Sequence, residues 1–131
     1  MTDFSDAKTT LLELRNFVRE FVDERNWREF HTPKNLSMSL AIEAAELMEH
    51  FQWLTPDESL SLDETKRSEV GEEMADVFCY LLAISNELSI DLAAAIEKKM
   101  VKNRAKYPVK EYRGRYGADD PRPPTPATES E

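Results

Sequence analysis

Apolar residues recur every three or four positions along most of the chain, which is the spacing of amphipathic helices. The pattern predicts four helices, at residues 6–27, 35–54, about 62–88 and 92–106. The 131 residues include only three glycines and no alternating run of Val, Ile and Thr, so the sequence does not favour a sheet. The expected fold class is therefore all-α, with a four-helix core.

Residues with short polar side chains mark the expected helix starts, because their oxygens accept hydrogen bonds from the free N–H groups of a first turn. The expected caps are Ser5 or Asp6 for the first helix, Asn35 for the second and Asp91 for the fourth, and the third helix is expected to start at Leu62 or Asp63. Pro33 disfavours helix at Thr32, and Pro108 ends the last helix.

The C-terminal end of the chain differs from the rest in composition. From Gly117 onward it contains four of the seven prolines and no large apolar residue, which is typical of a disordered segment. The predicted organisation is one domain at residues 1–112, followed by a Pro-rich tail at residues 113–131.

Two of the expected helices place acids beside the apolar stripe, although acids on a surface helix normally lie opposite it. Successive helical residues turn by about 100°. Relative to Glu43, Leu47 and Phe51 then fall at about 40° and 80°, whereas Glu46 falls at about 300° and His50 at about 340°. Glu43 therefore lies on the edge of the stripe.

The helix at residues 62–88 repeats this arrangement. Relative to Glu73, Val77 and Leu81 fall at about 40° and 80°, Asp76 at about 300° and Tyr80 at about 340°. If the two helices pack through their stripes, the acids Glu43, Glu46, Glu73 and Asp76 approach one another. Four neighbouring carboxylates repel, and a divalent cation would relieve that repulsion.

The type of metal follows from the donor atoms. Oxygen ligands alone point to Mg²⁺, or Mn²⁺, rather than zinc. A di-iron bundle needs Glu-x-x-His on two helices, but the residue three before His50 is Leu47 and the expected helix at residues 62–88 has no histidine. The alternative without a metal is that these acids pair with Lys or Arg side chains across a surface groove.

Charge is unevenly distributed along the chain. The net charge is −9, yet residues 98–115 carry eight Lys or Arg against Glu111 alone, so this segment is +7 and the remainder −16. The overall charge disfavours a nucleic-acid partner, and the basic segment suits the phosphates of a metal-bound ligand. The alternative explanation of the basic segment is a solvated helix end, where Lys and Arg side chains complement the helix dipole.

Nothing in the sequence predicts a membrane span or a secretory signal. The longest apolar run, VFCYLLAI, is far shorter than the roughly 20 residues that a membrane helix needs. The first ten residues lack the basic-then-apolar pattern of a signal peptide, and the single Cys79 cannot form an internal disulfide. A cytoplasmic location without a membrane partner is expected.

Four stretches in order resemble a known family. They are ERNWREFHTPKNL (24–36), EAAELMEHFQW (43–53), EEMADVFCYL (72–81) and KMVKNRAKYP (99–108). Together they resemble the MazG-like all-α nucleoside-triphosphate pyrophosphohydrolases, and most closely the dCTP pyrophosphatase branch.

The resemblance implies Mg²⁺-dependent hydrolysis of dCTP or a modified dCTP to the monophosphate and pyrophosphate, which cleans the nucleotide pool. It also implies a homotetramer, built as a dimer of dimers. By position, Glu43, Glu46, Glu73 and Asp76 would hold the metal, and Glu46 or Glu43 would activate the attacking water. The expected substrate-binding residues are Trp27, His31, Lys34, Trp53, Tyr80, Lys99, Asn103 and Arg104.

Two other functions stay open at this point. The resemblance implies a histidine near the base at the position of Val18, which this sequence lacks, so dUTP, damaged or general nucleoside triphosphates are alternative substrates. The non-catalytic alternative is a helical oligomer that serves as a scaffold or binding module. In that case the acids would be solvated and both tryptophans would be packing anchors.

Overall fold

The computed structural model describes residues 3–127. The described residues contain helices and no strand, which confirms the all-α prediction. The helices are α1 (Leu11–Glu24), α2 (Pro33–Glu49), α3 (Pro56–Ser59), α4 (Glu64–Leu88), α5 (Leu92–Lys106) and α6 (Val109–Tyr112). The chain forms two compact units, Met1–Ile90 and Asp91–Glu131, and each is described by itself.

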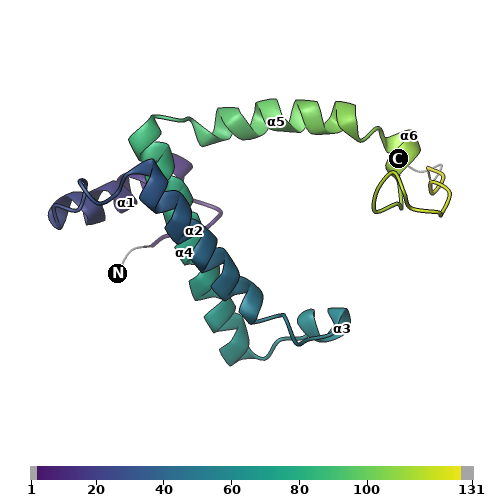
Figure 1. The fold of residues 1–131 in the computed structure, drawn as a ribbon, viewed down its shortest axis with the longest axis horizontal. Helices are drawn as coiled ribbons and strands as arrows, with labels where there is room; N and C mark the ends of the chain where they lie inside the picture. Colours follow the sequence, from purple (N-terminus) through teal and green to yellow (C-terminus); the bar gives the residue numbers. More distant parts are fainter. Residues whose placement is uncertain (1–2, 128–131) are drawn as a thin grey trace. The chain divides into compact units, whose positions relative to one another are not determined.

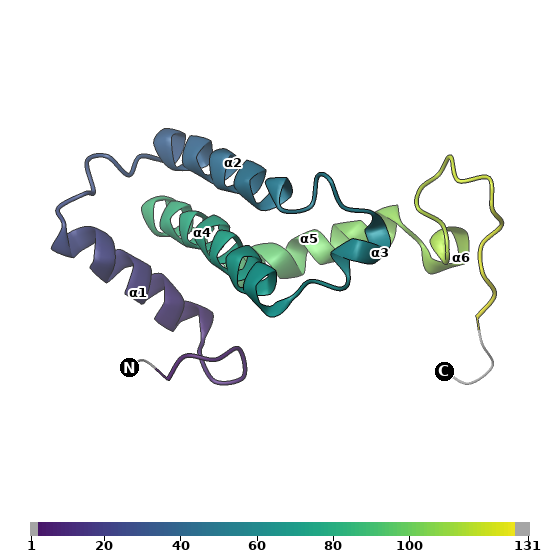
Figure 2. The same cartoon turned by 90° about the horizontal axis from the view of Figure 1, so that it is seen from below.

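The first unit is organised around α4, the longest of the described helices. Helix α2 packs along α4 over most of its length, and α1 packs against α4 as well (Figures 1 and 2). The apolar side chains buried between these helices are Val22, Leu36, Val70, Leu82 and Ala83. Because α2 and α4 meet through their apolar stripes, the acids at the stripe edges are brought into the same region.

Helix α1 begins later than the sequence indicated. Its cap is Thr10, whose hydroxyl accepts from the Glu13 N–H at 3.2 Å, while the Glu13 carboxylate accepts from the Thr10 N–H at 2.7 Å. The prediction of Ser5 or Asp6 as the cap was wrong, because this reciprocal capping box satisfies two free donors at once. The hydrogen bonds that the Glu13 carboxylate accepts from the Thr10 N–H and hydroxyl lower the pKa of Glu13.

Helix α2 begins earlier and ends earlier than predicted. Thr32 caps it through the Asn35 N–H at 3.3 Å, and Pro33 occupies the first turn, where its missing N–H is harmless. Asn35 is therefore inside the helix rather than its cap. The helix ends at Glu49 instead of Leu54, and turns follow it.

The other helix starts agree better with the sequence. Asp63 caps α4 and Asp91 caps α5, each by accepting a hydrogen bond from an N–H of the first turn. The short helices α3 and α6 were not predicted. Helix α3 begins within TPDE and ends at Ser59, and Thr55 is the cap of this single turn rather than only the break after α2.

The second unit contains α5, α6 and a hydrogen-bonded turn in the Pro-rich tail. Asp120 is 2% exposed, accepts from the Tyr116 N–H at 2.9 Å and forms a bidentate ion pair with Arg122. The Arg122 guanidinium holds the pKa of Asp120 well below its usual range. Residues 113–127 thus carry local contacts that their composition did not indicate, and the domain boundary after residue 112 stays a prediction.

No single described helix is long and apolar enough to cross a membrane. Helices α4 and α5 meet that test of length and composition only when they are taken together across the break between them.

Replacing the most buried leucine should measure the strength of the first unit's core. Leu82 is 2% exposed, so Leu82→Ala leaves a cavity and should lower the free energy of unfolding by about 2–5 kcal/mol in chemical denaturation. Leu60 is 83% exposed, and Leu60→Ala should change the same quantity by less than about 0.5 kcal/mol. An equal decrease in the free energy of unfolding for the two variants would contradict this description of the core.

Candidate functional site

Three carboxylates converge where α2 packs against α4. Glu43 comes from α2, and Glu73 and Asp76 from α4, with one carboxylate oxygen of each within 4.8 Å of those of the other two. Glu43 and Glu73 are half-buried and Asp76 is exposed. The spacing of three residues between Glu73 and Asp76 puts both on the side of α4 that faces α2.

Glu46 extends this group. A side-chain hydrogen bond with Glu46 is the largest cause that raises the pKa of Glu43 from 4.5 to about 7, followed by partial burial and the charges of Glu46, Asp76 and Glu73. The four acids predicted to hold a metal therefore influence one another in the folded chain. Without a cation, the group retains a proton near neutral pH, because full ionisation would place too many negative charges together.

The donors in this group suit a hard divalent cation. They are carboxylate oxygens, which Mg²⁺ and Mn²⁺ prefer, and no cysteine or histidine belongs to the converging set among the described residues. A bound cation would also offset the repulsion among these carboxylates. The assignment of these residues as metal ligands stays a prediction, and the geometry is compatible with it.

An aromatic cavity of about 400 Å³ adjoins the carboxylates. It lies between α1, the connection after α1, and α4, and Asp76 belongs both to its wall and to the carboxylate group. The Trp27 and His31 rings stack with centroids 6.2 Å apart and planes at 21°, and Phe21 meets Trp27 edge-on at 5.8 Å. Tyr80 also lines this cavity, so three predicted substrate-binding residues meet in one place.

His31 adds a polar atom to this aromatic cavity. Its Nδ1 is buried and has no hydrogen-bond partner among the described residues. Buried polar atoms are normally paired, so this nitrogen is available to a ligand group. Val18 also lines the cavity.

A second, polar cavity of about 690 Å³ also borders the carboxylates. Glu46 and Glu73 line it together with His50, Lys66 and Trp53. Trp53 is 87% exposed and lies here, whereas Trp27 lines the aromatic cavity. The two tryptophans predicted for the substrate therefore belong to different cavities in this chain.

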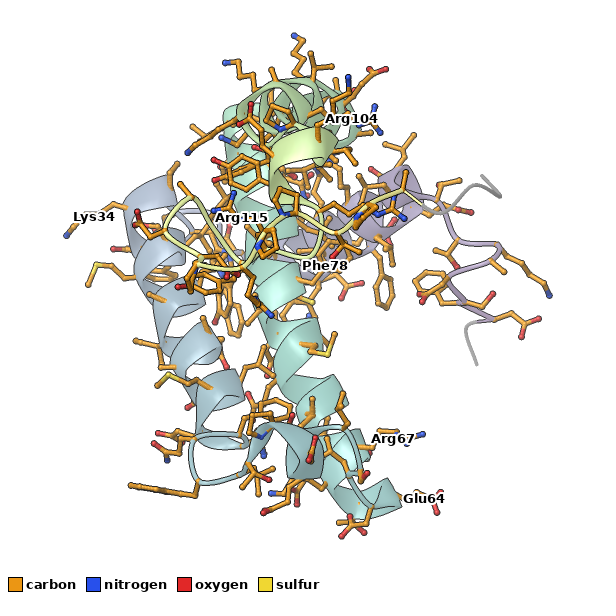
Figure 3. All side chains as sticks on the ribbon, turned by 90° about the vertical axis from the view of Figure 1, so that its right-hand side faces the viewer. Lys34, Glu64, Arg67, Phe78, Arg104 and Arg115 are labelled. Carbon is orange, nitrogen blue, oxygen red and sulfur yellow. The ribbon has the colours of Figure 1, made fainter. Side chains whose placement is uncertain are left out.

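The residues predicted to bind the phosphates are divided between the two units. Lys34 is exposed and extends outward from the start of α2, away from α4 (Figure 3). Lys99, Asn103 and Arg104 lie on α5 in the second unit. Their roles stay predictions.

Sequence reasoning missed Lys66 and left His50 without a role. Lys66 Nζ lies 2.9 Å from Glu69 Oε2 and 3.3 Å from His50 Nδ1, at the edge of the polar cavity. The available signal was spacing, because Lys66 precedes Glu73 by seven residues and therefore lies on the same face of the helix.

Comparisons with known proteins agree with the resemblance, and three of the four motif stretches lie within the matched family region. The model of the MazG-like family matches residues 38–116. The solved structure of a pyrophosphatase from Archaeoglobus fulgidus is 42% identical, covers 82% of this chain and 98% of its own, and superposes with a TM-score of 0.71.

The chain is also similar in sequence to part of the length of curated relatives. The dCTP pyrophosphatase 1 of Bos taurus is 39% identical over 82% of this chain and 65% of its own, and that of Homo sapiens is 40% identical over 76% and 59%. The chain thus spans at most about two thirds of the length of these relatives.

Removing one charge from the carboxylate group should stabilise the metal-free chain at high pH. The pKa of Glu43 is raised from 4.5 to about 7, so the folded chain binds this proton more tightly than the unfolded chain, and wild type loses stability as pH rises through that range. Glu43→Gln cannot ionise. We expect its Tm in chelator to match wild type at pH 5 and to exceed it by roughly 3 to 6 °C at pH 8.

The control is Glu72→Gln, an exposed acid on α4 outside the converging group. Its Tm difference from wild type should be the same at every pH. A Glu43→Gln difference that stays constant from pH 5 to pH 8 would show that the carboxylates do not repel one another in the folded chain.

Proposed function

Because the chain belongs to the MazG-like family, we propose that it is an Mg²⁺-dependent nucleoside-triphosphate pyrophosphohydrolase acting on dCTP or modified dCTP. The reaction would cleave the bond between the α and β phosphates with water and release the monophosphate and pyrophosphate. The observation that supports this most directly is the carboxylate group that shares Asp76 with an aromatic cavity. A nucleobase and the metal-bound phosphates could then occupy neighbouring sites.

The proposed metal ligands are the four acids of α2 and α4. A bound Mg²⁺ supplies charge neutralisation on the phosphates and lowers the pKa of a coordinated water. Glu46 hydrogen-bonds to Glu43 and borders the polar cavity, so it is placed to orient a water or to accept its proton. Glu43 is the second candidate for that role, because it is three residues from Glu46 on the same side of α2.

The aromatic cavity is the proposed base site. Flat rings of Trp27, His31 and Tyr80 suit stacking or edge contacts with a nucleobase, and the unpartnered His31 Nδ1 could hydrogen-bond to its edge. Val18 places an aliphatic group in this wall, which leaves the cavity able to accept other bases. For this reason dUTP, damaged and general nucleoside triphosphates are the second set of substrates to test.

We extend the proposal to a homotetramer built as a dimer of dimers. Large apolar side chains on α2 and α4 remain exposed in the single chain, among them Ile42 at 60% and Met74 at 57%. Phe78 and Leu81, at 40% and 41%, follow Met74 on the same side of α4. Packing these faces against another copy would remove them from water and cover an apolar surface that monomers rarely expose.

The proposal includes the basic segment and the cellular location. Lys99 and Arg104 on α5, with Lys34 on α2, would contact the triphosphate, and Asn103 would line the site. The reaction would take place in the cytoplasm, as part of nucleotide-pool cleaning.

A panel of nucleotides tests the reaction. With Mg²⁺, we expect dCTP or 5-modified dCTP to give the monophosphate and pyrophosphate, and we expect excess chelator to abolish turnover. Glu43→Ala and Asp76→Ala should each lower kcat/KM by about 100-fold or more, because each removes a proposed metal ligand. The matched control Glu72→Ala should retain wild-type kcat/KM.

The outcomes separate the alternatives. Equal turnover of all bases would favour a general pyrophosphohydrolase, and orthophosphate as the sole product would reject the proposed bond cleavage. Failure of Mg²⁺ and a non-hydrolysable nucleotide to bind in calorimetry would favour the scaffold alternative.

The base site has its own test. Trp27→Ala should weaken binding of a non-hydrolysable dCTP analogue by roughly 5- to 100-fold, because it removes one stacking ring. Trp27→Phe keeps an aromatic face and should recover most of that affinity. Equal affinities of wild type and Trp27→Ala would place the base outside the aromatic cavity.

A further inference from the structure

A chain of polar side chains runs from the first turn of α4 to the carboxylate group. Lys66 Nζ lies 2.9 Å from Glu69 Oε2 and 3.3 Å from His50 Nδ1, and His50 Nε2 lies 3.8 Å from Glu73 Oε1. The side chain of His50 is only 17% exposed and that of Glu73 only 24%. The mechanism proposed above uses neither His50 nor Lys66.

The contact with Lys66 determines which nitrogen of His50 carries the proton. A lysine ammonium can only donate hydrogen bonds, so Nδ1 must accept from Lys66. In the neutral ring the hydrogen is then on Nε2, the nitrogen that faces Glu73. The ring therefore presents a donor to the carboxylate.

The backbone holds these groups in a fixed order. Lys66, Glu69 and Glu73 are three and four residues apart on α4, so they share one face of that helix. His50 is the C-cap residue of α2, the helix that packs along α4. Glu69 holds the Lys66 ammonium on this face, and Lys66 in turn holds the imidazole.

We propose that His50 is a positioning residue that orients Glu73 for cation binding, and that Lys66 fixes the tautomer of His50. This inference rests on the proposed metal site. A carboxylate has more acceptor positions than one metal bond uses, so an N–H donor at Oε1 leaves the other oxygen free for the cation. The separation of 3.8 Å exceeds a hydrogen bond, so the proposed role requires the Glu73 side chain to rotate toward the ring when the cation binds.

The test measures the dissociation constant of Mn²⁺, without substrate, by electron paramagnetic resonance of the full chain. We expect His50→Leu to weaken Mn²⁺ binding by roughly 10-fold or more, as found for outer-shell partners of metal ligands. His50→Gln keeps an N–H donor and should stay within about 3-fold of wild type. Gln52→Leu, which alters the same cavity, is the matched control and should bind as wild type does.

The variant Lys66→Met tests separately whether Lys66 acts on cation binding through His50. If Lys66 acts through His50, the double variant His50→Leu/Lys66→Met should bind Mn²⁺ no more weakly than His50→Leu alone. The Tm of each metal-free variant, measured in parallel, should stay close to wild type, which separates loss of positioning from loss of folding.

Three results would overturn the proposal in different ways. Wild-type affinity of His50→Leu would reject the positioning role and leave the proposed function intact. Additive losses in the double variant would show that Lys66 acts on its own. No Mn²⁺ binding by wild type would reject the metal site itself, and this inference with it.

Discussion

The packing of α2 along α4 is the constraint on which the candidate site depends. It buries apolar side chains such as Leu36 and Val70, and the same contact forces Glu43, Glu73 and Asp76 within 4.8 Å of one another. Hydrophobic burial thus supports an arrangement that electrostatics opposes. The raised pKa of Glu43 is the visible consequence, since the group keeps a proton where isolated glutamates lose theirs.

Two cavities of different character border this group. The aromatic one shares Asp76 with the carboxylates, and the polar one shares Glu46 and Glu73. A ligand with a flat apolar end and an anionic, metal-binding end matches this order, and a nucleoside triphosphate is such a ligand.

The periodicity of apolar residues predicted most of the helices, and the helix ends that it predicted wrongly have local physical causes. Helices α4 and α5 began where Asp63 and Asp91 indicated, because an Asp cap acts within its own first turn. Thr10 was missed because its strength as a cap comes from reciprocal bonds with Glu13, which propensity alone underrates. The continuous pattern through Leu54 hid the end of α2, since turn residues there remain apolar.

The sequence by itself determined which side chains lie on the edge of each apolar stripe, because helical periodicity follows from hydrogen bonds between residues four apart. It therefore identified Glu43, Glu73 and Asp76 as neighbours of the packed face. Only the tertiary structure decided that Trp27 and Trp53 line different cavities, and that His50 lies between Lys66 and Glu73. The physical reason is that contacts between helices depend on their axial offset and rotation, which the packing of the whole core sets and no single stretch of sequence encodes.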